Sequence, residues 1–474
     1  MPIEELPTLG HKVAMEKDQL RDSCTSIETL TSENSLVKLK TAPSARSTEA
    51  LATPPNTGHL HNLTTEQREK LFQLWEMLFD YFSAPFDRTP SKRQKEVSLE
   101  RLDGCLQDAY ERKETTVTEG ESTAFESNPL TGEMFSQCST DDSDRTVLRY
   151  LRARKWVVPD AFNMLTDALK WRHSSGLREL MCEGERKIKM SLMEGGKNFF
   201  WKTDKDGRLV CYIRSRLHDK NAQTLAESID FTILTVEVGR RLRDHEDQLV
   251  TVIFDLRDAP LSSLDVGMMQ FMVQALQSFY PEILGKCLVM EAPWIFNGFW
   301  KMVRPLLDPA VAAKIEFIKQ ADLTTYVDAD KIPLEYGGTD VFSYQYTLPQ
   351  ITDYPRPASE SESQLLLTRL EVLKTRFVEC TREMHSFMAR VDSPLELESL
   401  LLPHRERRDE IKKQLQNCYR QFDTLVLPKT HYHRIGVLDE DWRVDWSRYK
   451  SPPSPPECRM SAPPILEEKL YCKK

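Results

Sequence analysis

Between residues 198 and 318, short apolar runs alternate with longer helical patterns, and this alternation restricts the fold more than any other feature of the chain. The polar turn Asp204-Lys205-Asp206-Gly207 joins the first two runs, which are therefore expected to form an antiparallel hairpin. Helical patterns separate the later runs, and strand–helix–strand order is typical of a parallel sheet. We therefore predict an α/β fold with a mixed, mostly parallel five-stranded sheet, whose strands cover residues 199–203, 209–214, 249–255, 286–291 and 315–318.

The last long helical pattern before the fifth strand, at 294–307, is apolar on nearly its whole circumference. A helix that lies on a core needs only one apolar stripe, so both sides of this helix should contact apolar groups. Either the helix is buried between layers, or it is a lid whose far side covers an apolar ligand or touches a membrane. Helix-breaking residues such as Pro293 and Pro305 lie towards both ends, which favours movement as a unit. The residues of this candidate gate helix are Trp294, Phe296, Phe299, Trp300, Val303 and Leu307.

Composition divides the rest of the chain into helical and unstructured parts. A capping signal at Thr64 opens a helix with apolar residues at three- and four-residue spacing, and a similar spacing returns on both sides of Pro394 and Pro403, where we expect a break. Stretches rich in Ser, Thr, Pro and charge cannot bury enough apolar surface to order themselves. We predict a disordered tail at 1–62, a helical lobe at 63–190 with a disordered insertion at about 84–140, a helical hairpin at 360–427, and a C-terminal segment at 428–474 that is disordered towards its end.

Charge and cysteine usage exclude several classes of protein. A net charge of −9 and a pI near 5.7 argue against a nucleic-acid binder that neutralises phosphates over its whole surface. No run approaches the roughly 18 apolar residues of a membrane span, and the first residues do not resemble a signal peptide. The ten cysteines include no CxxC pair, so neither a zinc site nor a disulfide framework is indicated. We expect a cytoplasmic protein with reduced thiols.

The sequence contains no recognisable catalytic constellation. It lacks the GxSxG, HExxH, GxGxxG and P-loop patterns, and its glycine pairs lack the spacing that cradles a phosphate. His218 and His245 stand among charged residues, which is typical of solvent-exposed histidines. We therefore predict a binding protein rather than an enzyme, with no metal and no cofactor.

Five motifs occur in the order and spacing of a CRAL-TRIO lipid-transfer domain. They are LRYLRARKW at 148–156, TDKDGRLVCYIR at 203–214, YPEILGK at 280–286, APW with LLDP between 292 and 309, and PLEYGG at 333–338. The chain resembles the fungal phosphatidylinositol-transfer branch of that family, over about 141–340 and the helix that begins near Leu63. The resemblance implies a CRAL-TRIO domain at 191–345, where a sheet and a gating helix enclose one lipid.

The resemblance also implies a site for the lipid headgroup. The family's inositol-phosphate residues correspond to Arg154, Lys155, Glu282 and Lys314. Their chemistry fits, since the three cations can pair with phosphate oxygens and Glu282 can accept from inositol hydroxyls or orient Lys314. For Arg154 and Lys155, a solvated basic helix end is the alternative interpretation.

Two departures from the family pattern concern the lipid pocket. Val311 stands where phosphatidylinositol binders usually place a threonine, and the lost hydroxyl donor should weaken binding by about 1 kcal/mol. Apolar residues replace the hydroxyls that hold the phosphate of phosphatidylcholine, whose burial without partners costs several kcal/mol. The residues expected to line the pocket are Val250, Val252, Phe254, Leu276 and Val311.

The predicted function is therefore intracellular binding and transfer of phosphatidylinositol, and of a neutral hydrophobe such as a sterol rather than phosphatidylcholine. The alternative is a lipid-sensing regulatory or scaffold module without bulk transfer, because a fold alone does not decide function. Expected partners are the lipid and the transient surface of endoplasmic reticulum, endosomal or other internal membranes. The C-terminal hairpin packs on the lipid domain, self-associates or recruits a protein.

Overall fold

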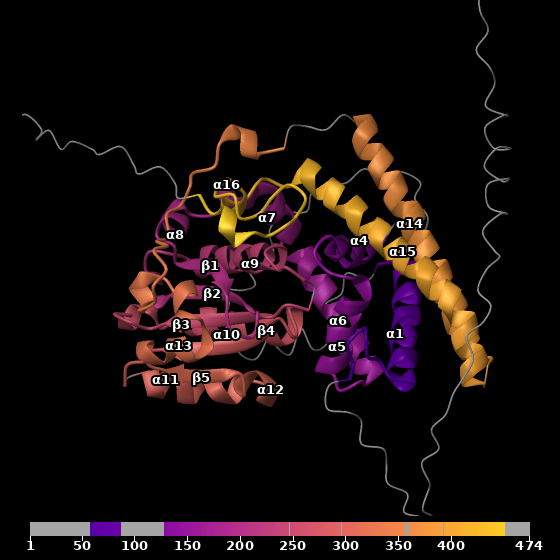
Figure 1. Ribbon diagram of the computed structural model, residues 1–474, viewed down its shortest axis with the longest axis horizontal. Helices are drawn as coiled ribbons and strands as arrows, with labels where there is room; N and C mark the ends of the chain where they lie inside the picture. The colour runs from indigo at the N-terminus through magenta and orange to yellow at the C-terminus, as the bar shows by residue number, and fades with distance from the viewer. Residues whose placement is uncertain are drawn as a thin grey trace, which may run out of the picture. The chain divides into compact units, whose positions relative to one another are not determined.

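The five predicted strands form one sheet in the order β1-β2-β3-β4-β5 (Figure 1). β1 pairs with β2 in antiparallel orientation, and every other neighbouring pair is parallel. The predicted mixed, mostly parallel sheet is confirmed. In this computed structural model, which describes residues 57–86, 128–245, 247–294, 296–355, 360–391 and 393–450, the strands are β1 Asn198–Thr203, β2 Leu209–Arg214, β3 Val250–Asp255, β4 Leu284–Met290 and β5 Ile315–Ile318.

The hairpin between β1 and β2 turns as its residues require. Gly207 has a φ of +76°, a conformation that costs a glycine little. The side chain of Asp204 accepts hydrogen bonds from the backbone N–H groups of Asp206 and Arg208, at 3.0 and 2.8 Å. These bonds close the turn and set the antiparallel register.

The two faces of the sheet differ in how they are covered. Side chains alternate between faces along each strand, and one face carries Tyr212, Ile253 and Leu288 into a closed core. Helix α13 (Leu323–Tyr326) and the segment 332–342 contribute to that core. The other face carries Val252 and packs against helical elements, namely α9 Leu225–Arg241, α10 Val266–Gln274 and α11 Phe296–Val303, with the short α12 Pro309–Ala312 leading into β5.

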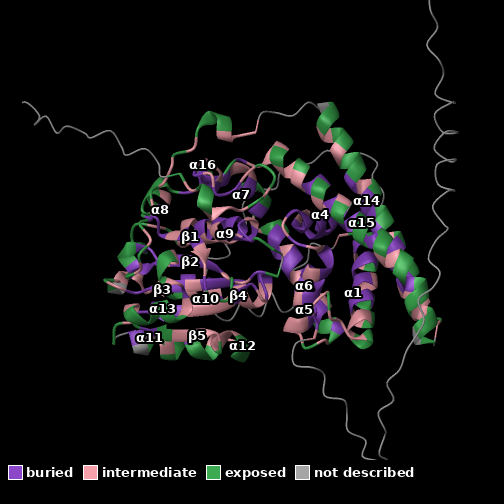
Figure 2. Ribbon diagram, viewed as in Figure 1, coloured by how far each residue is buried: buried purple, intermediate pink, exposed green. Residues whose placement is uncertain are grey.

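A helical lobe precedes the sheet. Its helices are α1 Thr65–Ser83, α4 Pro129–Ser136, α5 Ser143–Ala153, α6 Val158–Ser174, α7 Leu177–Glu183 and α8 Met190–Glu194. Thr64 and Gln67 cap α1 reciprocally, as predicted. Figure 2 shows buried residues concentrated in α1, α4 and α6.

Helix α4 lies within the range 84–140 that was predicted to be disordered, so that prediction is wrong for residues 129–139. The side chain of Asn128 caps the helix, and Pro129 occupies its first turn, where proline is tolerated. Three apolar residues of this short helix, Leu130, Met134 and Phe135, are buried in the lobe. A single short apolar stripe in a long polar stretch was too weak a signal to predict it.

The C-terminal hairpin consists of α14 Glu360–Met388 and α15 Pro394–Val426, which pack on each other and, through α14, on α1 (Figure 1). Pro403 lies inside α15, so the helix begins at Pro394 and continues through the second predicted break. The hairpin is joined to the lobe by a buried ionic cluster. Arg408 and Lys412 both reach the carboxylate of Asp144, at 2.8 and 2.9 Å.

Residues after the hairpin return to the sheet. Helix α16 (His431–Arg434) places Tyr432 beside β1, where its hydroxyl accepts a hydrogen bond from the backbone N–H of Phe200 at 2.6 Å. The rings of Trp446 and Tyr449 contact Trp201 edge-on. The tail predicted to be disordered covers 1–62, and that prediction is wrong for residues 57–62, where the backbone N–H of His59 donates to the side chain of Asn62 at 2.9 Å. The rest of the predicted tail, most of the insertion and the segment beyond Lys450 lie outside the described residues.

Candidate functional site

The central strand of the sheet is not fully buried on its second face. A central parallel strand is normally buried on both faces, yet Val252 and Phe254 of β3 remain partly accessible. Cys287 on β4 is also partly accessible, while desolvation raises the pKa of its thiol to about 12. The apolar face under α10 and α11 is therefore incompletely filled.

A cavity of about 70 Å³ occupies this region, where the far ends of β2 and β3 meet α10 and α11. Its wall is mostly apolar and includes Phe254, Leu256, Met268 and Phe296, whereas one side, around Lys197 and His218, is polar. Small-molecule pockets usually measure about 300–1,000 Å³, so a whole lipid requires the cavity to widen. A larger surface hollow of about 260 Å³ near Glu227 is lined mainly by charged residues and offers little apolar wall.

The residues predicted to line the pocket occupy several places. Phe254 lines the cavity directly. Val250 is buried in the main core, and Val252 and Leu276 pack against that core with part of their surface accessible. Val311 lies on α12 and is half-buried.

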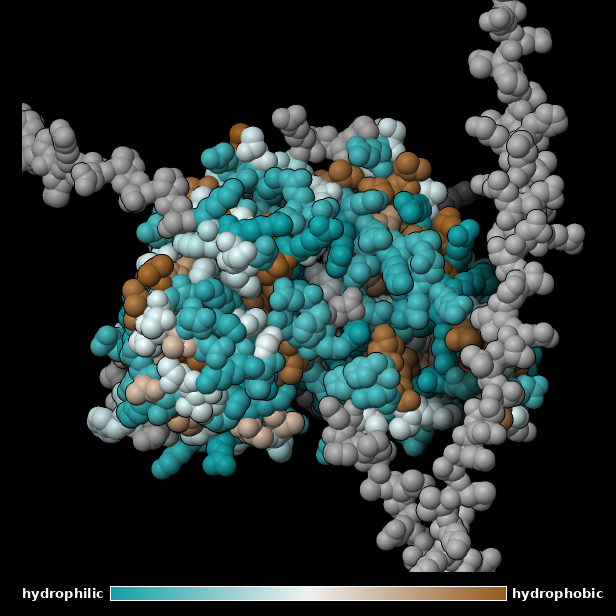
Figure 3. Space-filling model, viewed as in Figure 1, coloured by the Kyte–Doolittle hydropathy of each residue, from teal (hydrophilic) through white to brown (hydrophobic). Residues whose placement is uncertain are grey.

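Helix α11, which covers part of the cavity, presents apolar residues both inward and outward. Phe296 and Val303 are buried, and Phe296 packs with Leu256 and Val289. Phe299, Trp300 and Leu307 are half-buried, whereas Trp294 just before the helix is 83% exposed and Met302 is 49% exposed. The alternative of a helix buried between layers is therefore wrong. On the face shown in Figure 3, by comparison, hydrophobic residues form small separate patches in a largely hydrophilic surface.

A charged cluster lies at the opposite end of the parallel strands, in the loop before β4. The Nε atom of Arg152, in the last turn of α5, lies 2.6 Å from Oε2 of Glu282. Its Nη1 donates to the carbonyl of Gly58 at 2.7 Å. Arg152 is not among the headgroup residues predicted from the sequence, although it belongs to the same basic run as Arg154. The signal that could have identified Arg152 is its position in the last turn of a helix, from which a long side chain can contact a neighbouring loop.

The other predicted headgroup residues, Lys314, Arg154 and Lys155, differ in their contacts. Lys314 donates to the carbonyl of Leu284 at 2.6 Å, and burial lowers the pKa of its ammonium despite the opposing effect of Glu282. Arg154 caps α5 and donates to the adjacent carbonyl of Ala153 at 3.4 Å. Lys155 is exposed. The structure thus brings Glu282 and Lys314 within electrostatic reach of each other.

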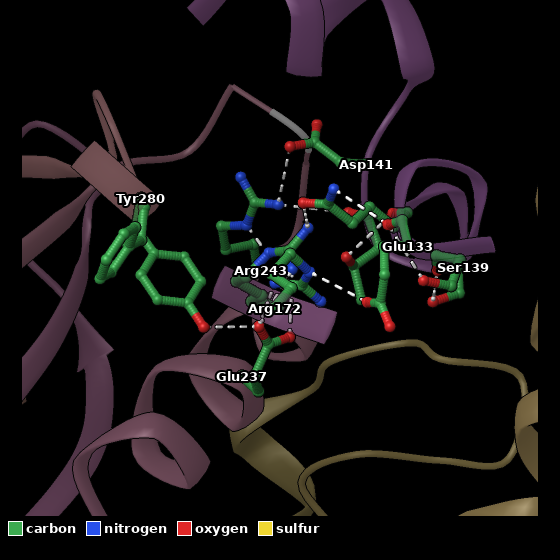
Figure 4. Close-up of polar contacts among 12 residues, drawn as sticks. Glu133, Ser139, Asp141, Arg172, Glu237, Arg243 and Tyr280 are labelled. Carbon is green, nitrogen blue, oxygen red and sulfur yellow. Dashed lines mark hydrogen bonds and ion pairs between the residues drawn. The ribbon is translucent and has the colours of Figure 1, made fainter. Parts of the chain in front are cut away.

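Tyr280 anchors the loop that carries Glu282 to helix α9. The hydroxyl of Tyr280 donates to Oε1 of Glu237 at 2.8 Å, and Arg172 donates to the same oxygen at 2.8 Å (Figure 4). Glu282 itself has a φ of +57°, which non-glycine residues adopt rarely. Backbone of this kind persists where the surroundings determine it and is frequent at functional sites.

The prediction for His218 is wrong, whereas His245 is exposed as expected. His218 is buried in the polar wall of the cavity, beside Lys197. Its charged sequence neighbours suggested exposure because local composition does not reveal that Lys197, from another segment, covers the ring. Among the described residues, no group of His, Cys, Asp and Glu is arranged to hold a metal ion, and no helix is long and apolar enough to cross a membrane.

An apolar cavity against one face of a mixed sheet, together with ionic groups at the opposite end of the strands, fits a protein that binds an amphipathic ligand. Comparison with known families agrees. The CRAL/TRIO domain model matches residues 193–338, and the model of the CRAL/TRIO N-terminal domain matches residues 78–167. The chain belongs to the CRAL-TRIO family.

Several fungal proteins are similar to the chain. Phosphatidylinositol transfer protein CSR1 of Eremothecium gossypii is 30% identical over 65% of this chain and 71% of its own length. A CRAL-TRIO domain-containing protein of Schizosaccharomyces pombe is 30% identical over 66% of this chain and 88% of its own length. The crystal structure of Sfh5 aligns with 51% of this chain and 94% of its own, at 17% identity and a TM-score of 0.38.

Proposed function

We propose that this protein binds phosphatidylinositol and transfers it between membranes. The observation that carries the proposal is the unfilled apolar face of β3 under α10 and α11, where Val252 and Phe254 remain accessible inside the fold. Apolar surface left uncovered in this way costs free energy unless a ligand covers it. Acyl chains are apolar ligands that could cover this surface. The similarity to a phosphatidylinositol transfer protein supports this choice of lipid.

The headgroup is proposed to bind at the end of the sheet where β4 and β5 begin, at Arg154, Lys155, Glu282 and Lys314. The structure adds Arg152 to these residues. A guanidinium or ammonium group forms charge-assisted hydrogen bonds with phosphate oxygens. Glu282 already accepts from Arg152 and has lone pairs for inositol hydroxyls. Phosphate binding would offset the loss of hydration that lowers the pKa of Lys314.

Helix α11 is proposed to be the gate. A cavity of about 70 Å³ is too small for a phospholipid, so an element that covers it has to move. Trp294 and Met302 already project outward, and aromatic residues favour the membrane interface. Contact with a bilayer would therefore stabilise an open position of the gate.

Two measurements test the function. Mass spectrometry of lipid that copurifies with the full chain should identify phosphatidylinositol, and labelled phosphatidylinositol should move between vesicles in proportion to protein concentration. Lipid that copurifies without vesicle transfer would favour the second candidate, a lipid-sensing module. Exposed leucines on the hairpin, among them Leu365 and Leu402, favour a protein partner in that case.

The proposed setting is the cytoplasm, with transient contact at endoplasmic reticulum, endosomal or other internal membranes. A neutral hydrophobe such as a sterol is the proposed second ligand, and phosphatidylcholine is not. We propose no catalytic activity, no nucleic-acid partner and no cofactor.

A further inference from the structure

The polar wall of the cavity contains a chain of three titratable residues from three different segments. Lys197, which precedes β1, is buried, and its Nζ lies 2.7 Å from Nδ1 of His218. Nε2 of His218 lies 3.2 Å from Oδ2 of Asp265, which also caps α10. All three residues line the cavity that Phe254 and Phe296 bound on its apolar side.

The contacts determine how these groups are protonated. A lysine ammonium has only donors, so Lys197 donates to Nδ1 of His218, and the neutral ring carries its proton on Nε2 and donates to Asp265. Burial lowers the pKa of His218, and the charge of Lys197 lowers it further. Burial also lowers the pKa of Lys197 to about 8. With Lys197 charged and Asp265 ionised, these three residues together have no net charge.

Two further polar atoms in the same wall have no partner. The hydroxyl oxygen of Ser215 and the side-chain oxygen of Asn198 are buried and have no hydrogen-bond partner among the described residues. Both residues line the cavity beside Lys197 and His218. A buried polar group without a partner is unfavourable, so these two atoms indicate a polar group that the cavity receives from outside the protein.

We infer that this wall binds the hydroxyl group of an otherwise apolar lipid. A hydroxyl accepts from Ser215 or Lys197 and at the same time donates to Asn198 or Asp265. A phosphate or carboxylate would accept from the donors but would place its charge near Asp265 and the oxygen of Asn198. A hydrocarbon would leave Ser215 and Asn198 unpaired.

The rest of the cavity suits the apolar part of such a lipid. Met268, Met269 and Met272 project from one helix towards the aromatic side chains Phe254, Phe296 and Phe299. Methionine side chains are unbranched and flexible, so they can rearrange around ligands of different shape. This flexibility allows the cavity of about 70 Å³ to widen around a larger ligand.

The hydroxyl site is separate from the proposed headgroup site. Ser215 follows the end of β2 and Asp255 ends β3, whereas Glu282 comes just before β4 begins. Parallel strands of six residues separate the two ends by about 20 Å. The inference rests on the proposed function only in that the cavity holds a lipid, and it assigns the chemistry of a second ligand.

Binding of dehydroergosterol to the full chain tests the inference, with energy transfer from tryptophan as the signal and the 3-methyl ether of the same sterol as the comparison probe. A second pair, tritiated 1-hexadecanol and hexadecane, tests whether the apolar part must be a ring system. In at least one pair the wild type should bind the alcohol about tenfold more tightly than the probe without a hydroxyl donor. Equal affinities within both pairs would overturn the inference, as would tighter binding of hexadecanoate than of hexadecanol.

Two variants assign the preference to this wall. Ser215→Ala and Lys197→Met should each reduce the preference for the alcohol severalfold and leave affinity for the comparison probe unchanged. Lys205→Met is the matched control, because Lys205 is exposed and donates to the carbonyl of Thr324 outside the cavity. Ser215→Ala keeps the test valid if Lys197→Met does not fold, and an unchanged preference in a folded Ser215→Ala protein would overturn the assignment.

Phosphatidylinositol transfer is measured on the same preparations. Absence of transfer from a wild type that prefers the alcohol would contradict the proposed function and leave the hydroxyl site intact. Normal transfer by a wild type without that preference would contradict the hydroxyl site and support the proposed function.

Discussion

Arg152 and Glu282 join the helical lobe to the sheet, with Nε of the arginine 2.6 Å from Oε2 of the carboxylate. The arginine ends α5, and the glutamate lies in the loop before β4. The pair therefore holds Glu282 close to the last turn of α5 at the proposed headgroup site. It also means that Glu282 already accepts a charge-assisted hydrogen bond before any lipid binds, so inositol hydroxyls would add to this contact rather than replace it.

Lys314→Ala should lower phosphatidylinositol transfer about tenfold or more. A charge-assisted hydrogen bond contributes about 1.5–3 kcal/mol, and Lys314 is partly desolvated beside Glu282. Vesicle transfer of labelled phosphatidylinositol measures the change. Lys319→Ala is the control, because its side chain is 72% exposed and pairs with Glu291 at the other end of the sheet. Unchanged transfer by a Lys314→Ala protein of normal thermal stability would remove this lysine from the site.

Phosphatidylcholine should move between vesicles no faster with the protein than without it. The side chains at Val250, Val252 and Leu276 provide no hydroxyl, and a choline phosphate buried beside them would lose hydration worth several kcal/mol. The assay uses donor vesicles that contain both lipids, each with a different label. Equal transfer of the two lipids would show that these three positions do not face the phosphate.

Much of the sheet could be predicted because local pattern and tertiary structure agree there. The runs that contain Val210 and Ile253 are apolar, bounded by turn residues and buried in one core, so their sequence determines their structure directly. The cap of α1 was predictable for the same reason, since Thr64 and Gln67 are three residues apart and each side chain accepts a hydrogen bond from the other's backbone N–H.

The charged parts of the structure could not be predicted, because their partners are distant in sequence. The sequence places Asp144 at the start of a helix, yet its carboxylate pairs with Arg408, which is 264 positions later in the chain. His218 stands among charged residues in the sequence, and only the fold brings Nζ of Lys197 within 2.7 Å of its Nδ1. Charges that pair across segments leave no periodic signal in a single sequence.

Arg408→Met should lower the free energy of unfolding by about 3 kcal/mol, since removal of one of its two cationic partners leaves the buried carboxylate of Asp144 with Lys412 alone. Nη2 of Arg408 lies 2.8 Å from Oδ1 of Asp144, and the indole N–H of Trp75 donates to the same oxygen at 2.8 Å. Urea denaturation measures the loss. Arg382→Ala on the neighbouring helix is the control, because its pairs with Glu76 and Asp80 are near the surface and should contribute less than about 1 kcal/mol. Equal losses in both variants would contradict a special role for the cluster.

Stability should fall in acid because Glu237 is ionised inside the fold. Burial alone would raise the pKa of this carboxyl, but the charges of Arg172 and Arg240 outweigh burial and hold the pKa well below its ordinary value. The unfolded chain binds this proton at about pH 4, so below that pH the unfolded state binds more protons than the folded state, and stability decreases. The contribution should be complete above about pH 5 and decline as the pH falls below about 4.

Urea denaturation at pH 7, 5, 4 and 3 measures this dependence. Glu237→Gln should be less stable at pH 7, because Arg172 and Arg240 lose their buried counter-charge, and should lose less further stability in acid than the wild type does. Identical pH profiles for the two proteins would show that other carboxylates control acid unfolding.

The gate can be tested through its most exposed residue. Trp294 is 83% exposed, so Trp294→Ala should leave thermal stability nearly unchanged. If the indole enters the membrane interface when α11 opens, the variant should release lipid to vesicles severalfold more slowly, because the open position loses a favourable contact. Leu395→Ala is the control, since this leucine is 86% exposed on the hairpin, away from the cavity.

Hydrogen exchange gives an independent view of the same motion. Amides of α11, residues 296–303, should exchange faster when vesicles are present, because outward movement breaks the packing of Phe296 on Leu256 and Val289. Amides of β3 should remain protected in both conditions, since the sheet does not need to open for a lipid to enter from its α10 and α11 side. If α11 stays equally protected while phosphatidylinositol transfer proceeds at its normal rate, the lipid enters by another route and α11 is an ordinary cover of the core.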